Sequence, residues 1–203
     1  MMDDSGVMST GTGIHRNLLG ITDAAQLHHA EADFVTLRLV ELQCSPIPGG
    51  FNPAHLQQIH RHLYQDLYDW AGELRSAEDA TLLQPLDSVL DRIRASDMLR
   101  GHAPEDWATS VAGYLGELTQ LQPFPTDSGI TLREFASELA RKNQLGLEWE
   151  RAFLAHQQEV QSVNLRRLLM LAMDNDPSSQ RPSRGPRQHH PLERLPLFGG
   201  PRP

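Results

Sequence analysis

Apolar residues recur at a helical spacing in one segment after another, and proline or glycine interrupts the pattern between segments. A spacing of three and four residues places side chains on one face of a helix, whereas the strict alternation of a half-buried strand is convincing nowhere in this chain. The sequence therefore predicts an all-α fold. The chain has 203 residues, 39% of them hydrophobic, so it is long enough to bury one sizeable core.

Six helical segments are expected. The first begins with Thr22 as N-cap and runs to about Gln43, with a buried stripe of Leu27, Ala30, Phe34, Leu37 and Val40. The second begins at Asn52 and Pro53 and ends at Gly72, with a buried stripe of Leu56, Ile59, Leu63, Leu67 and Trp70. The remaining segments are expected at 85–99, from Pro104 to 121, after the break at 123–129 to about 145, and at 148–173 in two pieces.

Composition divides the chain into three parts: a flexible N-terminus at 1–13, a helical domain at 14–175 and a tail at 176–203. Residues 177–203 hold seven prolines and three glycines with little apolar periodicity, which predicts disorder. Residues 177–203 also hold five arginines and one acid. Three roles stay open for it: a solvated tail, an arm for an acidic surface, or a signal for type IV secretion.

Charge and apolar run lengths exclude several classes of partner. The net charge is −8 and residues 177–203 contribute about +4, so the net charge of the remaining residues is near −12, which argues against nucleic acid as a partner. No apolar run approaches the roughly 20 residues of a membrane span, and no secretory signal is evident at the N-terminus. We therefore expect a cytoplasmic protein.

Isolated reactive side chains favour structural roles. Cys44 has no obvious base nearby, so a buried or neutral thiol is favoured over a nucleophile. The histidines at 28, 29, 55 and 62 lack an acid or cysteine at metal-ligand spacing, and His60 is expected in the core. Tryptophans 70, 107 and 149 are expected as core anchors. The apolar segment 165–173 is expected to pack on the bundle, with a partner or homodimer interface as the alternative.

Several stretches resemble the Fic/Doc family, whose typical activity is AMP transfer from ATP to protein hydroxyls. They are residues 16–23, Glu31, Arg38-Leu39, residues 50–60 and the block Leu67-Tyr-Asp-Trp-Ala-Gly-Glu-Leu-Arg75, which is similar to the family's tryptophan-alanine-glycine element. The resemblance covers most of residues 12–150. It implies a Fic-like helical bundle.

The family signature, H-P-F-x-[D/E]-G-N-G-R-x-x-R, corresponds to residues 122–133 with its spacing intact and its chemistry changed. The resemblance assigns the general base to Gln122, which cannot take a proton, and the magnesium ligand to Thr126, which has no charge. Asp127 adds a negative charge where phosphates would lie, and Ile130 removes a phosphate-binding arginine. Only Ser128, Gly129 and Arg133 remain as nucleotide contacts, with Ser128 a candidate helix cap.

Two other sequence features of the family are not evident in this chain. Nine residues, 76–84, separate Arg75 from the next expected helix, which leaves little room for the hairpin that docks a target segment. The inhibitory motif (S/T)-x-x-x-E-(G/N) is not evident. The sequence thus predicts a pseudoenzyme that binds a protein partner, as in a toxin–antitoxin pair, with homo-oligomers possible and no cofactor. The alternative is an active adenylyltransferase, or a related phosphate-group transferase, that uses ATP and magnesium through atypical residues.

Overall fold

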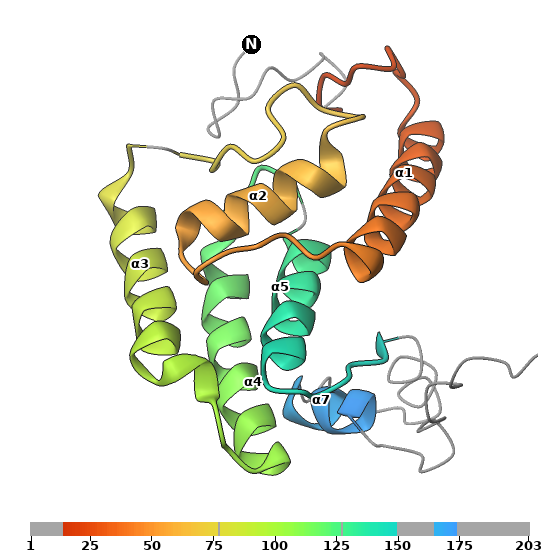
Figure 1. Ribbon diagram of the computed structural model, residues 1–203. Helices are drawn as coiled ribbons and strands as arrows, with labels where there is room; N and C mark the ends of the chain where they lie inside the picture. Colours follow the sequence, from red (N-terminus) through yellow and green to blue (C-terminus); the bar gives the residue numbers. More distant parts are fainter. Residues whose placement is uncertain (1–13, 77, 127, 150–164, 174–203) are drawn as a thin grey trace, which may run out of the picture.

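The computed structural model describes residues 14–76, 78–126, 128–149 and 165–173, and the regular elements in these ranges are helices joined by loops (Figure 1). No strand is assigned within these ranges, which confirms the all-α prediction. The expected flexible N-terminus, the tail at 176–203 and most of the expected helix after residue 148 lie outside the described residues. The helices are α1 (Ala24–Cys44), α2 (Pro53–Tyr64), α3 (Ala80–Ala95), α4 (Pro104–Leu121), α5 (Gly129–Lys142) and α7 (Leu165–Met173), with a short 3₁₀ turn, η1 (Asp97–Leu99).

The core lies where α2 meets α1, α3 and α5, and where α4 meets α3, α5 and α7. Leu56 and Ile59 of α2, Trp107 of α4 and Phe135 of α5 are almost completely buried there. Figure 1 shows α4 and α5 running side by side with α2 crossing above them, and α7 lying beside the lower end of the pair. This arrangement places the loop between α4 and α5 against α2, behind it in the view of Figure 1.

The expected start and stripe of the first helix are partly wrong. Asp23, not Thr22, is the N-cap, because its carboxylate accepts the N–H of Gln26 at 2.9 Å. The buried residues of α1 are Leu27, Val35 and Leu42, whereas Leu37 and Val40 are 55% and 52% exposed. Among the elements that the structure describes, the principal neighbour of α1 is α2, which packs on the side that carries these buried residues.

The second helix starts as expected, with the Asn52 side chain accepting the N–H of His55 at 2.9 Å and Pro53 in the first position. It ends at Tyr64 rather than Gly72, so that expectation is wrong. The carbonyl of Leu67 accepts the N–H of Leu18 from the N-terminal segment at 2.8 Å, which takes it out of a helical ladder. The chain therefore continues to Gly72 in successive turns, with Leu67 and Trp70 still buried.

The third helix begins five residues before its expected start. Asp79 caps it by accepting the N–H of Thr81 at 2.8 Å, and Pro85 lies inside the helix instead of at its first turn. The helix also ends at Ala95, before the 3₁₀ turn. A favourable cap thus outweighs the hydrogen bond that Pro85 cannot donate.

The other expectations for the core are confirmed. Helix α4 begins at Pro104, and Trp70 and Trp107 are buried. Trp149 is half-buried, and its indole N–H donates to Ser137 at 2.8 Å. In α7, Leu169 and Met173 are buried in the core, as expected for a segment packed on the bundle. None of the helices described is long and apolar enough to cross a bilayer.

Candidate functional site

The loop that carries the signature residues joins the end of α4 to the start of α5 (Figure 1). Its first residue, Gln122, adopts the left-handed conformation, with φ 42° and ψ 65°, and its side chain is exposed. A left-handed residue at a helix C-terminus reverses the chain direction, at a conformational cost for any residue other than glycine. The loop therefore leaves α4 through a sharp turn that other contacts must stabilise.

Arg75, the last residue of the tryptophan-alanine-glycine block, supplies two of these contacts. Its backbone N–H donates to the carbonyl of Pro123 at 2.9 Å, and its Nε donates to the carbonyl of Gln122 at 3.0 Å. Both acceptors lie at the sharp turn. Arg75 thus ties the turn to a segment 47 positions earlier in the sequence.

His60 of α2 supports the same loop from inside the core. Its ring stacks on Phe124 with centroids 3.9 Å apart, and its Nδ1 accepts the N–H of Gly72 at 2.8 Å. Since Nδ1 is an acceptor, Nε2 carries the proton of the neutral ring and donates to Thr126 Oγ1 at 3.3 Å. Burial lowers the pKa of His60 to about 3, so the ring is neutral at pH 7. The expected core position of His60 is confirmed.

A hollow of about 450 Å³ opens between this loop and the start of α5. The residues that line it come from the Arg75 segment, the end of α4 and the loop: Arg75, Thr119, Gln122, Phe124, Pro125, Thr126, Ser128 and Gly129. No described residue in this lining is a carboxylate or a histidine. Arg75 is its one charged side chain among the residues described.

The expectation that Ser128 caps α5 is wrong. Ser128 occupies the N-cap position with φ −73° and ψ −8°, which is helical backbone rather than the extended backbone from which a cap side chain reaches the first turn. Its side chain makes no cap hydrogen bond, and Oγ is buried without a partner in the structure. A buried hydroxyl without a partner costs about 1–3 kcal/mol.

The structure brings together only some of the expected contact residues. Ser128 and Gly129 line the hollow, whereas Arg133 lies one turn further along α5, half-buried and outside the lining. Ile130 packs against the core. Asp127 lies outside the described residues.

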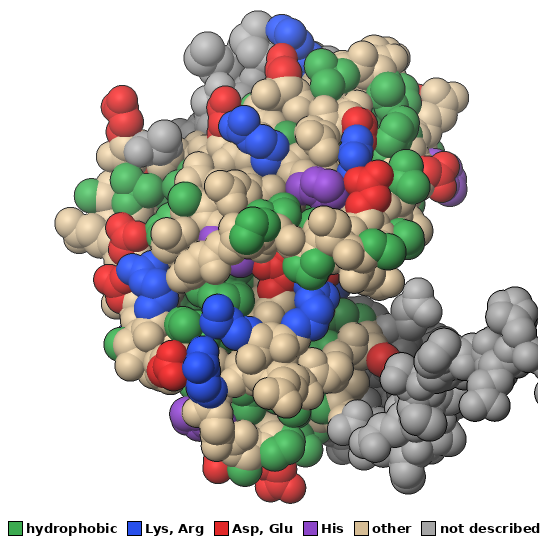
Figure 2. All heavy atoms as spheres, viewed as in Figure 1, with side chains coloured by type: hydrophobic (Ala, Val, Ile, Leu, Met, Phe, Trp, Pro, Cys, Tyr) green, Lys and Arg blue, Asp and Glu red, His purple; other side chains and the backbone are tan. Residues whose placement is uncertain are grey.

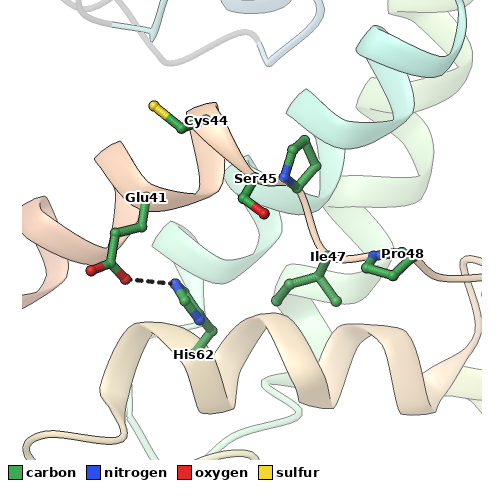
Figure 3. Close-up of a pocket in the computed structure, with 7 residues that line it drawn as sticks. Glu41, Cys44, Ser45, Ile47, Pro48 and His62 are labelled. Atoms are coloured by element: carbon green, nitrogen blue, oxygen red, sulfur yellow. Dashed lines mark ion pairs between the residues drawn. The ribbon is translucent and has the colours of Figure 1, made fainter.

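A second hollow, of about 530 Å³, lies at the C-terminal end of α1 (Figure 3). Glu41 and His62 face each other across it, with Oε2 and Nε2 3.3 Å apart, and Ile47 and Pro48 form its apolar side. Cys44 is exposed, so a buried thiol is the wrong prediction, and Figure 3 shows its sulfur directed away from His62. The described residues contain no group of three His, Cys, Asp or Glu side chains that could hold a metal ion.

No family model matches the chain, but curated proteins and solved structures do. The protein adenylyltransferase VbhT of Bartonella schoenbuchensis is 33% identical over 150 residues, which cover 69% of this chain and 31% of VbhT. The probable protein adenylyltransferase Fic of Salmonella typhimurium is 31% identical over 150 residues, which cover 69% of this chain and 74% of the relative. The chain belongs to the Fic family. It spans about a third of the length of VbhT.

The solved structures agree on the fold. The BepC protein of Bartonella tribocorum, a VirB-translocated effector solved with bound AMPPNP, has a TM-score of 0.70 at 20% identity, covering 85% of this chain and 96% of that one. The N-terminal Fic domain of a VirB-translocated effector from Bartonella quintana has a TM-score of 0.68 at 22% identity, covering 83% and 90%. The predicted Fic-like bundle is therefore confirmed.

Sequence reasoning missed Arg75 and Thr119 as residues of the site. Arg75 was visible only as the last residue of the tryptophan-alanine-glycine block, where nothing local shows that its side chain turns toward residue 122. Thr119 lies on α4, and its hydroxyl donates to the carbonyl of Leu115 at 2.7 Å, so it reads as an ordinary helix residue. Only the packing of α4 against α5 brings it to the hollow.

Proposed function

We propose that this chain is a Fic-fold protein that has lost adenylyl transfer and acts by binding a protein partner. The supporting observation is the set of residues that line the hollow of about 450 Å³ between the signature loop and the start of α5. Gln122 stands at the family's base position, and no described residue of the lining accepts a proton near neutral pH. Loss of a general base alone lowers a rate by about 10²–10⁴-fold.

His60 is the nearest described histidine to offer a replacement, but its contacts oppose that role. Both ring nitrogens are engaged, one as acceptor for Gly72 and the other as donor to Thr126. Its pKa of about 3 makes it a poor base at pH 7, and the ring is fully buried between Phe124 and Tyr64. We therefore assign His60 to holding the loop.

The described residues do not fit a magnesium nucleotide in the way that the family signature does. The metal-ligand position holds Thr126, whose hydroxyl is engaged by His60, and no carboxylate lines the hollow among the described residues. The position of the first phosphate-binding arginine holds Ile130, an apolar residue packed on the core. Ser128, Gly129 and Arg133 remain the nucleotide contacts that we would test, and we expect no cofactor.

Partner binding has support outside the hollow. Hydrophobic side chains gather over α1 at the upper right of Figure 2, and Leu18, Leu19, Leu37 and Val40 are 43–56% exposed. Exposed aliphatic side chains of this size are typical of contact surfaces when they occur together. A regulatory protein of a toxin–antitoxin pair in the bacterial cytoplasm is the role that we favour. A second copy of the chain is the alternative partner, and type IV secretion the alternative destination.

An active adenylyltransferase is the second candidate, and the relatives favour it. VbhT and the Salmonella protein are both named adenylyltransferases, and BepC was solved with AMPPNP. Under this alternative, ATP and magnesium are cofactors and a base must come from an atypical residue. The two candidates differ in a single measurable property, the transfer of AMP.

The experiment follows label from ATP labelled in its α-phosphate into protein hydroxyls, with magnesium, in the purified chain and in a lysate. A restored variant carries the family residues through Gln122→His, Thr126→Glu, Asp127→Gly and Ile130→Arg. We expect no label in the natural chain, and label in the restored variant if the scaffold is otherwise intact. Magnesium-dependent transfer by the natural chain at a rate comparable to the restored variant would establish the second candidate instead.

A further inference from the structure

The second hollow, of about 530 Å³ at the C-terminal end of α1, has an apolar wall and shares no described lining residue with the hollow at the signature loop. Ile47 and Pro48, from the loop that joins α1 to α2, form this wall (Figure 3). Among the residues described, the lining has one carboxylate, that of Glu41, and no lysine or arginine. A hollow of this composition fits a ligand that carries aliphatic groups and one cation.

The carboxylate at the edge of this hollow belongs to a cluster whose charges do not cancel. Arg38 donates to Oε2 of Glu41 at 2.8 Å and to the two carboxylate oxygens of Asp66 at 2.7 and 2.8 Å. One guanidinium therefore faces two carboxylates. The contacts found for Glu41 among the described residues, from Arg38 and His62, both involve Oε2, and its side chain is 43% exposed. Oε1 of Glu41 is thus open to a further cationic donor.

One short segment of this chain has the composition that the hollow requires. Within residues 177–203, the large aliphatic and aromatic side chains all lie in residues 192–198, and Arg194 lies among them. They are Leu192, Leu195, Leu197 and Phe198. Pro196 favours an extended backbone there, the form in which proline-containing segments bind grooves.

Charge and chain length allow this segment to reach the hollow. Residues 177–203 contribute about +4 to the net charge of −8, so the oppositely charged helical domain attracts them. Eighteen residues separate Met173, the end of α7, from Leu192, and an extended chain of that length spans roughly 60 Å. A folded domain of about 160 residues has a radius of gyration of only about 15 Å. The tether also keeps the segment at a roughly millimolar effective concentration, which populates even a weak contact.

We propose that residues 192–198 bind in the second hollow of the same chain. Arg194 pairs with Oε1 of Glu41, and the leucines beside it pack on Ile47 and Pro48. The inference goes beyond the proposed function and does not rest on it, because this hollow lies apart from the signature loop.

The test measures how fast Cys44 reacts with a neutral maleimide in the full chain at pH 7.5, where an imidazole in water is mostly uncharged. Cys44 is the only cysteine of the chain, lines the hollow and is exposed, so the rate reports on this hollow alone. The variants are Arg194→Gln and a double leucine variant, Leu195→Ser with Leu197→Ser. Arg187→Gln is the matched control, because Arg187 lies in the same part of the sequence and outside residues 192–198.

We expect the reaction to be about two- to fivefold faster in Arg194→Gln, and faster still in the double leucine variant, because each substitution releases the segment from the thiol that it covers. Arg187→Gln should react at the natural rate. Equal rates in all four chains overturn the proposal. An equal acceleration in Arg187→Gln also overturns it, because only the overall charge would then matter.

A double-mutant cycle tests the pairing of Arg194 with Glu41. Glu41→Gln also changes the charge beside Cys44, so the informative quantity is the effect of Arg194→Gln within the Glu41→Gln background. We expect Arg194→Gln to have little effect on the rate there, because its partner is already absent. An undiminished acceleration overturns the pairing. The melting temperature of each Glu41 variant checks that it is folded.

Two further measurements identify the occupant of the hollow. A reaction rate of the natural chain that does not change with protein concentration assigns the segment to the same chain, whereas protection that grows with concentration means that a second copy supplies it and overturns the proposal. A synthetic peptide of residues 190–203 is then added to the double leucine variant. We expect the peptide to slow the reaction again, and no effect at millimolar peptide would overturn the proposal.

Discussion

At the scale of single residues, His60 links α2 to the loop that carries the signature residues. Its protonation state affects the free energy of unfolding. Its pKa is about 3 in the folded protein because of burial, against roughly 6.5 in an unfolded chain. At pH 7 the ring is neutral in both the folded and the unfolded state. Its contribution to the free energy of unfolding is therefore fully present above pH 6.5. Below pH 6.5 the His60 ring is protonated in the unfolded state but stays neutral in the folded state. The contribution of His60 to the free energy of unfolding therefore falls until about pH 3.

We therefore predict that the free energy of unfolding falls as the pH is lowered from 6.5 to 4, with His60 contributing up to about 1.4 kcal/mol per pH unit. Urea unfolding of the natural chain and of His60→Asn, at a series of pH values, measures the difference in slope. His102→Asn, which changes an exposed histidine, is the control and should keep the natural slope. If His60→Asn keeps the natural slope of unfolding free energy against pH, the buried His60 ring is not the source of this pH dependence.

Gly72 is the other residue that this junction requires. Its φ is +89°, and a Cβ there would lie 2.8 Å from Arg61 Cβ and 2.9 Å from the carbonyl oxygen of Gln57. We predict that Gly72→Ala lowers the free energy of unfolding by about 2 kcal/mol or more. Gly101, with φ +77° and nothing within 4 Å of a Cβ, is the matched control, and Gly101→Ala should cost about 1–2 kcal/mol. Urea unfolding that gave equal losses would contradict the steric account.

At the scale of elements, the boundaries show where local sequence decides structure. Asn52 and Pro53 start α2 as predicted, because a cap and a first-turn proline act within a few residues. Its end at Tyr64 does not follow from the apolar pattern, and beyond it the carbonyl of Leu67 accepts the N–H of Leu18 from the N-terminal segment. The start of α2 could thus be predicted from adjacent residues, although the expected starts of α1 and α3 were wrong. The segment after Tyr64, by contrast, makes a contact between parts of the chain about 50 residues apart.

Helix α1 has apolar residues on two sides, so its sequence alone did not say which side is buried. Leu42 is fully buried and Leu37 is 55% exposed. We predict that Leu42→Ala costs about 2–5 kcal/mol of unfolding free energy, while Leu37→Gln changes it by less than about 0.5 kcal/mol. Urea unfolding of the two variants checks this. A large loss in Leu37→Gln without a change in oligomeric state would mean that the assigned faces of α1 are wrong.

At the scale of the whole molecule, the sequence predicted the helical bundle, because the family pattern keeps its spacing over most of the chain. The register that it gives to the signature at residues 122–133 stays a prediction. The sequence did not predict how the site is supported. Arg75 and His60 reach the loop from positions 47 and 66 residues away from their partners. These contacts depend on how α2, α4 and α5 pack, and no local pattern encodes them.

The central claim is that the Fic scaffold persists while nucleotide use has been lost. The most direct measurement is the melting temperature of the natural chain and of the restored variant, each with and without magnesium ATP. A ligand present at about 100 times its Kd stabilises the folded state by roughly 2.7 kcal/mol, which is readily measured. We predict that the restored variant is stabilised and the natural chain is not. Equal stabilisation of the natural chain by magnesium ATP would contradict the claim.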